Sequence, residues 1–203
     1  MKKLLLIVCL CLGINVTAWA GQEDLAKIED YLNNLQNLRA SFVQMSSNGG
    51  TAEGKIYISK PSKIRMEYTA PDSLLIVGNG DYIIYNDKEL DQITNIDYKD
   101  IPATMILTQK IKFDGKKLKV IDFYKDGGQT SLTVEMPENK TVKPITLIFD
   151  NSPFRLKQWK VVDQQNIEVT ISLFDVETDV ALDNNLFKFD KKSGNNGSGA
   201  RRK

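Results

Sequence analysis

The feature that most constrains the fold is the stretch of residues 54–86, which contains four short strand patterns joined by turns that its own residues specify. The second pattern alternates charged side chains with three apolar ones, as expected for a strand with one buried face, and these are Ile64, Met66 and Tyr68. An apolar run follows at residues 74–77. The sequence Gly-Asn-Gly-Asp at residues 78–81 is typical of a tight hairpin. We therefore predict an antiparallel meander.

The rest of the chain adds more strands and a few helices. Residues 23–38 place five apolar side chains on one helical face, which predicts an amphipathic helix that covers something apolar. Pro102 is expected to begin a short second helix at residues 103–110. Further strand patterns separated by turn residues cover residues 118–124, 130–136, 142–149, 154–162 and 167–174. About ten antiparallel strands with two or three helices predict an α+β domain, a curled sheet with helices against one face.

Residues 1–20 have the features of a secretory signal peptide. Lys2 and Lys3 make a basic start, and the apolar stretch at residues 4–13 is too short to span a bilayer. Ala18-Trp19-Ala20 then offers small residues at a cleavage site. We predict export with cleavage after Ala20.

The cysteines and the charges agree with export to a bacterial periplasm. Cys9 and Cys11 both lie inside the signal segment, so the mature chain is expected to have neither a disulfide nor a lipid anchor. The remainder divides into a folded domain at residues 21–190 and a flexible polar, basic tail at residues 191–203. Of the 27 basic residues, 20 lie in the domain against 26 acidic ones, which argues against a nucleic-acid-binding surface there.

The sequence lacks the residues of common catalytic and metal centres. It has no histidine and no cysteine beyond the signal segment, so catalytic triads and zinc sites are not expected, nor is a cofactor. Two carboxylate pairs, Glu89 with Asp91 and Asp175 with Glu177, would need a sugar cleft to act as a glycosidase. No aromatic cluster accompanies them, so we interpret them as solvated turns and do not expect an enzyme.

Four motifs occur in an order that matches a known family. K-x-R-x-x-Y-x-x-P at residues 63–71 is preceded in the chain by L-R-A-S-F-V-Q at residues 38–44. I-P-A-T-M-I-L at residues 101–107 and N-L-F-K-F at residues 185–189 follow. The chain from residue 22 to 189 thereby resembles the LolA-type periplasmic carriers of outer-membrane lipoproteins. In that family, the segment corresponding to residues 38–44 ends the first helix. The segments corresponding to residues 101–107 and 185–189 begin a lid helix and form a closing strand, respectively.

The resemblance implies an open, incomplete antiparallel β-barrel of ten to eleven strands, with a lid of two to three α-helices over an apolar cavity. It also implies a periplasmic monomer that binds the acyl chains of lipoproteins. In the family, cargo arrives from an inner-membrane, lipoprotein-releasing ABC transporter. It leaves to an outer-membrane lipoprotein receptor, or to the outer membrane itself.

Thirteen residues are predicted to line the cavity, because they are apolar and fall on inward strand positions or on the lid. They are Phe42, Ile58, Ile64, Met66, Tyr68, Val77, Met105, Ile106, Leu147, Phe149, Trp159, Val161 and Ile171. The residues alone leave a second interpretation open, in which they form a solid core and residues 103–110 an ordinary packed cap.

The lid clasp of the family is an arginine immediately before the proline that ends the second strand. Lys60 occupies that position here, and the resemblance implies that it bonds to carbonyls on or beside residues 103–110. An ammonium offers fewer donors than a guanidinium, so Arg65 is a second candidate for the clasp.

Two other functions remain open at this point. A lipid-binding envelope sensor or lipid carrier could use the same fold, although the related sigma-E regulators add a second domain for which this chain has no room. A structural outer-membrane barrel would need longer strands and outward aromatic girdles, which the sequence lacks.

Overall fold

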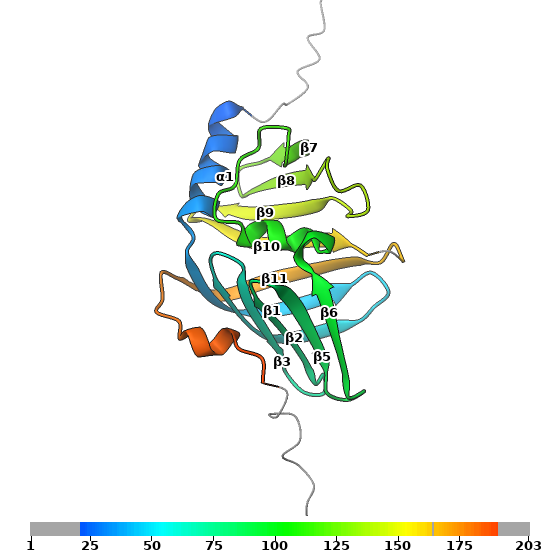
Figure 1. The fold of residues 1–203 in the computed structure, drawn as a ribbon. Coiled ribbons are helices and arrows are strands. Elements are labelled where there is room, and N and C mark those ends of the chain that lie inside the picture. The colour runs from blue at the N-terminus through cyan, green and yellow to red at the C-terminus, as the bar shows by residue number, and fades with distance from the viewer. Residues whose placement is uncertain (1–20, 164, 191–203) are drawn as a thin grey trace, which may run out of the picture.

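The computed structural model describes residues 21–163 and 165–190, so the predicted signal segment and tail lie outside the described residues. Its centre is a single 11-stranded antiparallel sheet in the order β6-β5-β4-β3-β2-β1-β11-β10-β9-β8-β7. Figure 1 shows this sheet curling around the short green helical segment that lies in front of it. The edge strands β6 and β7 pair with one neighbour each, so the sheet curls without closing.

The two halves of the sheet are meanders that meet at β1 (Asn37–Ser46), which pairs with β2 on one side and β11 on the other. The first half continues through β2 (Thr51–Ser59), β3 (Lys63–Tyr68), β4 (Leu74–Asn79), β5 (Tyr82–Asp87) and β6 (Gln92–Asp97). The second half contains β7 (Lys119–Lys125), β8 (Gln129–Glu135), β9 (Ile145–Asn151), β10 (Phe154–Val162) and β11 (Glu168–Thr178). The predicted meander of residues 54–86 is therefore confirmed as β2 to β5.

Local turn chemistry sets the hairpin between β4 and β5. Gly80 has a φ of 114°, a backbone conformation that favours glycine, and the Asn79 side chain accepts a hydrogen bond from the Asp81 amide at 3.1 Å. β4 ends at Asn79 and β5 begins at Tyr82, as the Gly-Asn-Gly-Asp sequence predicts.

In the described part of the chain, four helical segments accompany the sheet: α1 (Gln22–Asn34) and the 3-10 segments η1 (Tyr98–Asp100), η2 (Pro102–Leu107) and η3 (Asn184–Phe187). α1 and η2 pack on the concave face, whereas η3 packs on β3 and β4. The α+β class and the open barrel are confirmed. The lid differs from the expected two to three α-helices, because among the described residues α1 is its only α-helix.

Several helix and strand boundaries differ from the prediction, including those of β9, which begins at Ile145 instead of residue 142, and β11, which extends to Thr178 instead of residue 174. α1 ends at Asn34, and Leu38 belongs to β1, where it pairs with Ile58. Leu35 and Leu38 are both buried. Apolar residues at these two positions fit the buried face of a longer helix as well as the start of a strand, so the sequence pattern does not distinguish the two. The segment predicted as a helix at residues 103–110 is the shorter 3-10 segment η2, and the predicted closing strand at residues 185–189 overlaps the 3-10 segment η3.

Among the described residues, no helix has the length and apolar content needed to cross a membrane.

Candidate functional site

The candidate site is the concave face of the sheet, where one apolar layer joins strands from both meanders. The register places Ala40, Ile56, Met66 and Ile76 side by side on β1 to β4. On the other half, Ile171, Trp159, Leu147 and Leu132 make the equivalent row across β11 to β8. All eight side chains belong to the apolar cluster of the concave face or pack against it.

The lid segment inserts its own apolar side chains into this layer. Met105, Ile106 and Leu107 of η2 are only 5%, 2% and 2% exposed, and all three belong to the same cluster. From the opposite end, Ile28 and Leu32 of α1 are buried in it as well. In this closed arrangement, therefore, η2 covers the surface that was predicted to hold a ligand.

Twelve of the thirteen residues predicted to line the cavity lie in this cluster or pack against it. The exception is Val77, which pairs with Arg65 and therefore faces the opposite side of the sheet, although it is fully buried. Ile76 pairs with Met66 and takes the inward position instead. An unbroken apolar run shows no alternation, so residues 74–77 carry no signal for which neighbour points inward.

A close approach between the sheet backbone and an aromatic ring shapes the middle of the site. A Cβ atom on Gly54 would lie 2.1 Å from the carbonyl oxygen of Glu67 and 2.9 Å from the Phe42 ring. Phe42 in turn makes an edge contact with Tyr68 at 5.0 Å between ring centroids. The Tyr68 hydroxyl donates to Gln44 Oε1 at 2.7 Å, and burial raises the pKa of Tyr68. This partnered hydroxyl is a polar point within the apolar face.

Side chains of α1 hold the connection that follows η2. Asn33 makes a reciprocal pair with Ile111, because its Nδ2 donates to the Ile111 carbonyl at 2.9 Å and its Oδ1 accepts from the Ile111 amide at 2.7 Å. Glu29, one turn earlier, accepts from the Phe113 amide at 2.6 Å. Neither residue was among those predicted from the sequence to take part in the site. The available signal was a polar pair four residues apart beside the apolar stripe of the helix.

The turn after β2 holds η2 itself. The Ser62 amide donates to the Leu107 carbonyl at 3.0 Å, and the Ser62 carbonyl accepts from the Tyr98 hydroxyl. The same hydroxyl accepts from the Gly80 amide at 3.2 Å. The lid thus rests on the two turns at one end of the first meander.

Lys60 is buried, with 9% of its surface exposed, and its Nζ donates to the Leu32 carbonyl of α1 at 2.7 Å. The acceptor is therefore on α1, and the expectation of a bond to residues 103–110 is wrong for this closed state. The last turn of α1 contains no basic residue, so Lys60 brings a positive charge to the negative end of that helix. Burial lowers the pKa of Lys60 from 10.5 to about 8.

Arg65, the second clasp candidate, lies on the opposite side of the sheet from the lid. Its Nε donates to Glu67 Oε1 at 2.6 Å, and its Nη1 donates to the Leu186 carbonyl of η3 at 3.0 Å. The alternation of β3 explains this placement, because Ile64 and Met66 on either side face inward. Arg65 therefore holds η3, and the structure contradicts its expected role in the clasp.

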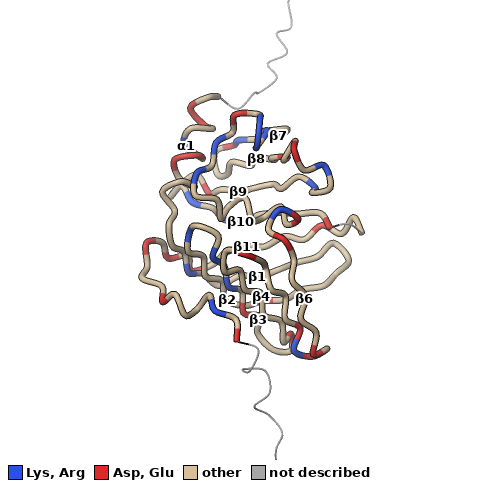
Figure 2. The backbone as a smooth tube through the Cα atoms, in the orientation of Figure 1, with Lys and Arg blue, Asp and Glu red and all other residues tan. Residues whose placement is uncertain are grey.

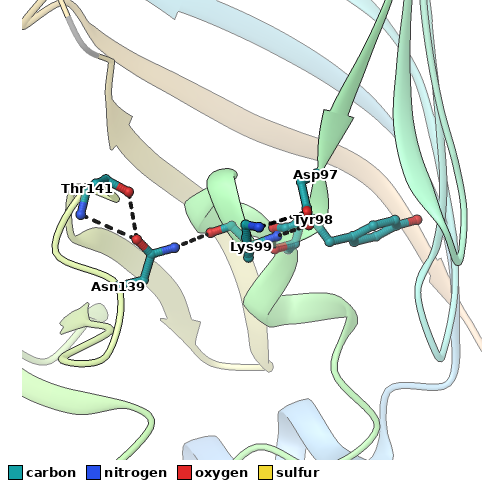
Figure 3. A network of polar contacts seen from close by, with 6 residues as sticks. Asp97, Tyr98, Lys99, Asn139 and Thr141 are labelled. Carbon is teal, nitrogen blue, oxygen red and sulfur yellow. Dashed lines mark hydrogen bonds and ion pairs between the residues drawn. The ribbon is translucent and has the colours of Figure 1, made fainter.

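An opening remains beside the closed lid. It is a pocket of about 520 Å³ between η2 and the connection from β8 to β9, and Met105, Leu107, Leu118 and Met136 are among the residues that line it. Figure 3 shows the polar bridge across this region, in which Asn139 Nδ2 donates to the Lys99 carbonyl at 2.7 Å. The site can therefore enclose an apolar ligand. Among the described residues, no group of three or more acidic, histidine or cysteine side chains could hold a metal ion.

Comparison with known proteins decides the family. The model of the family described as "Outer membrane lipoprotein carrier protein LolA" matches residues 33–190, which is most of the chain. The chain belongs to the LolA family. An uncharacterized protein of Rickettsia prowazekii is 26% identical over 192 residues, covering 93% of this chain and 88% of that protein. The outer-membrane lipoprotein carrier protein of Pseudomonas paraeruginosa is 26% identical over 206 residues and covers 95% of both chains.

Solved structures share the fold at much lower identity. A crystal structure of a DUF1329 family protein from Desulfovibrio piger superposes with a TM-score of 0.51 at 10% identity, covering 81% of this chain and 95% of that chain. Its likeness extends to the fold alone. Membership of the LolA family assigns this chain to a family of lipoprotein carriers.

Proposed function

We propose that this protein is a periplasmic carrier that shields the acyl chains of lipoproteins from water. It would accept them from an inner-membrane, lipoprotein-releasing ABC transporter and deliver them to an outer-membrane receptor or to the outer membrane itself. The proposed role makes and breaks no covalent bond, so the protein acts as a binding protein, not as an enzyme, and needs no cofactor. We propose that it acts as a monomer. The observation that carries the proposal is the burial of Met105, Ile106 and Leu107 in the concave face.

The energetics of this exchange suit a carrier. Each acyl methylene removed from water contributes about 0.8 kcal/mol, so lipoprotein chains cannot cross an aqueous compartment unshielded. The three lid side chains each gain about 1.5–3 kcal/mol from their own burial. A ligand that displaces them exchanges one apolar contact for another. Binding is then weak enough to be reversed, because the closed lid competes for the same surface.

The polar contacts of the lid favour the empty, closed state in this proposal. Lys60 holds the end of α1 through the Leu32 carbonyl, and Asn33 in the next position holds Ile111 in the connection beyond η2. Opening the lid breaks these few bonds, each contributing about 0.5–3 kcal/mol. The clasp thus acts on η2 indirectly, through α1.

To test the binding surface, we compare two variants that each introduce a carboxylate, one on the inward face of the sheet and one on its outward face. A fluorescent fatty-acid analogue should bind the mature wild-type protein, and Met66→Glu should weaken binding at least about tenfold, since a carboxylate in an apolar site is strongly disfavoured. Phe174→Glu is the matched control, because Phe174 is 51% exposed and its neighbour Leu173 is the residue that faces inward. Equal binding by both variants, with unchanged circular dichroism, would refute the assignment of the surface.

The test of transport is delivery of a labelled lipoprotein from the purified carrier to outer-membrane vesicles. Lys60→Leu should load cargo but release it more slowly, because the closed state loses the bond to Leu32, while Lys60→Arg should keep normal release. Mass spectrometry of lipids and lipoproteins that co-purify with the wild type identifies the cargo. Recovery of lipids without any lipoprotein would favour a lipid sensor or lipid carrier of the same fold instead.

A further inference from the structure

The pocket beside the closed lid combines an apolar floor with a basic rim. Met105, Leu107 and Leu118 are buried and, with Met136, form the floor. Lysines alternate with other residues along the connection between η2 and β7, and Lys110, Lys112 and Lys117 of this connection line the pocket. We call these three the rim lysines. All three are exposed, and Figure 2 shows basic segments recurring along this connection.

This charge distribution stands out from the rest of the domain. Residues 21–190 contain 20 basic and 26 acidic residues, whereas residues 108–118 contain four lysines and one aspartate. Around the pocket itself, four lysines face two carboxylates, Asp114 and Glu138. Asp114 is engaged locally, since its Oδ1 accepts from the Lys116 amide at 3.0 Å. The rim is therefore a positive region on an acidic protein.

The rim lysines are also those available to a ligand. Lys99, the fourth lysine of the pocket, forms an ion pair with Asp97 at 3.1 Å. No ion pair within 4.0 Å involves Lys110, Lys112 or Lys117 among the described residues. An apolar carrier site needs no such charge to bind an acyl chain, so the rim calls for a ligand that also carries an anion.

We propose that this pocket binds anionic lipids, with the acyl chain on the apolar floor and a phosphate-bearing headgroup among the rim lysines. The inference rests on the proposed function, because the floor residues belong to, or pack against, the same apolar cluster into which η2 inserts. It adds a preference by headgroup charge to a site that otherwise selects only for apolar chains. The pocket volume of about 520 Å³ falls within the range of small-ligand sites, and the rim lysines are exposed residues of its lining.

The experiment compares two lipids that share an acyl chain and differ in headgroup charge. Fluorescence titration of the mature protein should give about tenfold tighter binding of lysophosphatidylglycerol, which is anionic, than of lysophosphatidylcholine, which has no net charge. The preference should shrink as the NaCl concentration rises from about 20 mM to about 300 mM, since exposed charges are screened. Glycerol phosphate alone should bind far more weakly than either lipid, because it cannot use the floor.

The deciding variant is Lys110→Gln/Lys112→Gln/Lys117→Gln, which should reduce the preference to less than about twofold, chiefly by weakening the binding of lysophosphatidylglycerol. The matched control, Lys55→Gln/Lys88→Gln/Lys188→Gln, makes the same change of net charge at exposed lysines outside the pocket lining and should keep the preference.

The outcomes separate this inference from the proposed function. If the wild type bound both lipids with equal affinity, or if the preference survived in the rim variant, the proposed role of the rim lysines would be refuted. The proposed carrier function would be unaffected. Glycerol phosphate that binds as tightly as lysophosphatidylglycerol would also overturn it, because the rim would then be a free-phosphate site. Failure of the wild type to bind either lipid would instead count against the apolar site itself.

Discussion

The burial of Lys60 at the end of α1 predicts that the stability of the closed domain rises with pH. Burial disfavours the ammonium form and lowers its pKa from 10.5 to about 8. Between these values the folded protein binds fewer protons than the unfolded chain, so the free energy of unfolding increases as the pH rises from about 8 to about 10.5. Below pH 8 the penalty for the buried charge is present in full, and above 10.5 it has disappeared.

The structure sets the size of this effect. The interval from 10.5 to about 8 corresponds to at most about 3 kcal/mol of differential free energy. That is a substantial part of the 5–15 kcal/mol that typically stabilises a domain. The hydrogen bond to the Leu32 carbonyl remains possible in both protonation states, because a neutral amine also donates.

The assay is urea unfolding of the wild type and Lys60→Met at several pH values between 7 and 10.5. The difference between the two free energies of unfolding should shift in favour of the wild type by up to about 3 kcal/mol across this range, since titration of the other groups cancels. Lys60→Arg is the control, because its guanidinium stays charged throughout and should show no such rise. If the free energies of unfolding of the wild type and Lys60→Met changed in parallel with pH, the burial of this amine would be refuted.

Three further predictions follow from the packing. Gly54→Ala should destabilise the domain by about 2 kcal/mol or more in urea unfolding, because the new methyl group would overlap the carbonyl oxygen of Glu67. Asn33→Ala should speed hydrogen exchange at the Ile111 amide, which loses its acceptor, and raise the affinity for a fatty-acid analogue by loosening the lid. Val77→Ala should destabilise by about 1–3 kcal/mol yet leave fatty-acid binding unchanged, because this side chain is buried on the opposite face.

Each of these predictions has a contrary result. If Gly54→Ala were as stable as the wild type, β2 and β3 would have to lie farther apart at this position than they do in the structure. Unchanged exchange at Ile111 in Asn33→Ala would show that Asn33 does not hold the connection beyond η2. A loss of fatty-acid binding in Val77→Ala, at a temperature where the variant remains folded, would return Val77 to the ligand-binding face.

The strands of the fold could be predicted because their signals are local. Alternation at Ile64, Met66 and Tyr68 assigns one face of β3, and the turn at Gly80 sets the hairpin that follows. The helical segments were less predictable. In η2, six residues without a side-chain cap adopt a 3-10 conformation, and a helix this short depends on the surface beneath it more than on its own propensity.

The candidate site was predictable in membership but not in its polar contacts. Twelve of the thirteen proposed lining residues occupy the concave face, because an apolar side chain at an inward strand position can only be buried there. Val77 lies in an unbroken apolar run, which does not indicate which of its side chains point inward. Lys60 was the expected clasp and Arg65 the second candidate, but the structure gives each a different partner, the Leu32 carbonyl for Lys60 and the Leu186 carbonyl for Arg65.

By itself, the sequence determined which residues are apolar, how they repeat and where the chain turns, since these depend on neighbours a few positions away. Only the tertiary structure decided that Lys60 bonds to α1, that Asn33 holds Ile111 across 78 positions, and that lysines gather beside an apolar pocket. The partner of a long polar side chain depends on which distant backbone groups the packed elements leave unpaired. That arrangement exists only after the sheet has curled and the lid has closed on it.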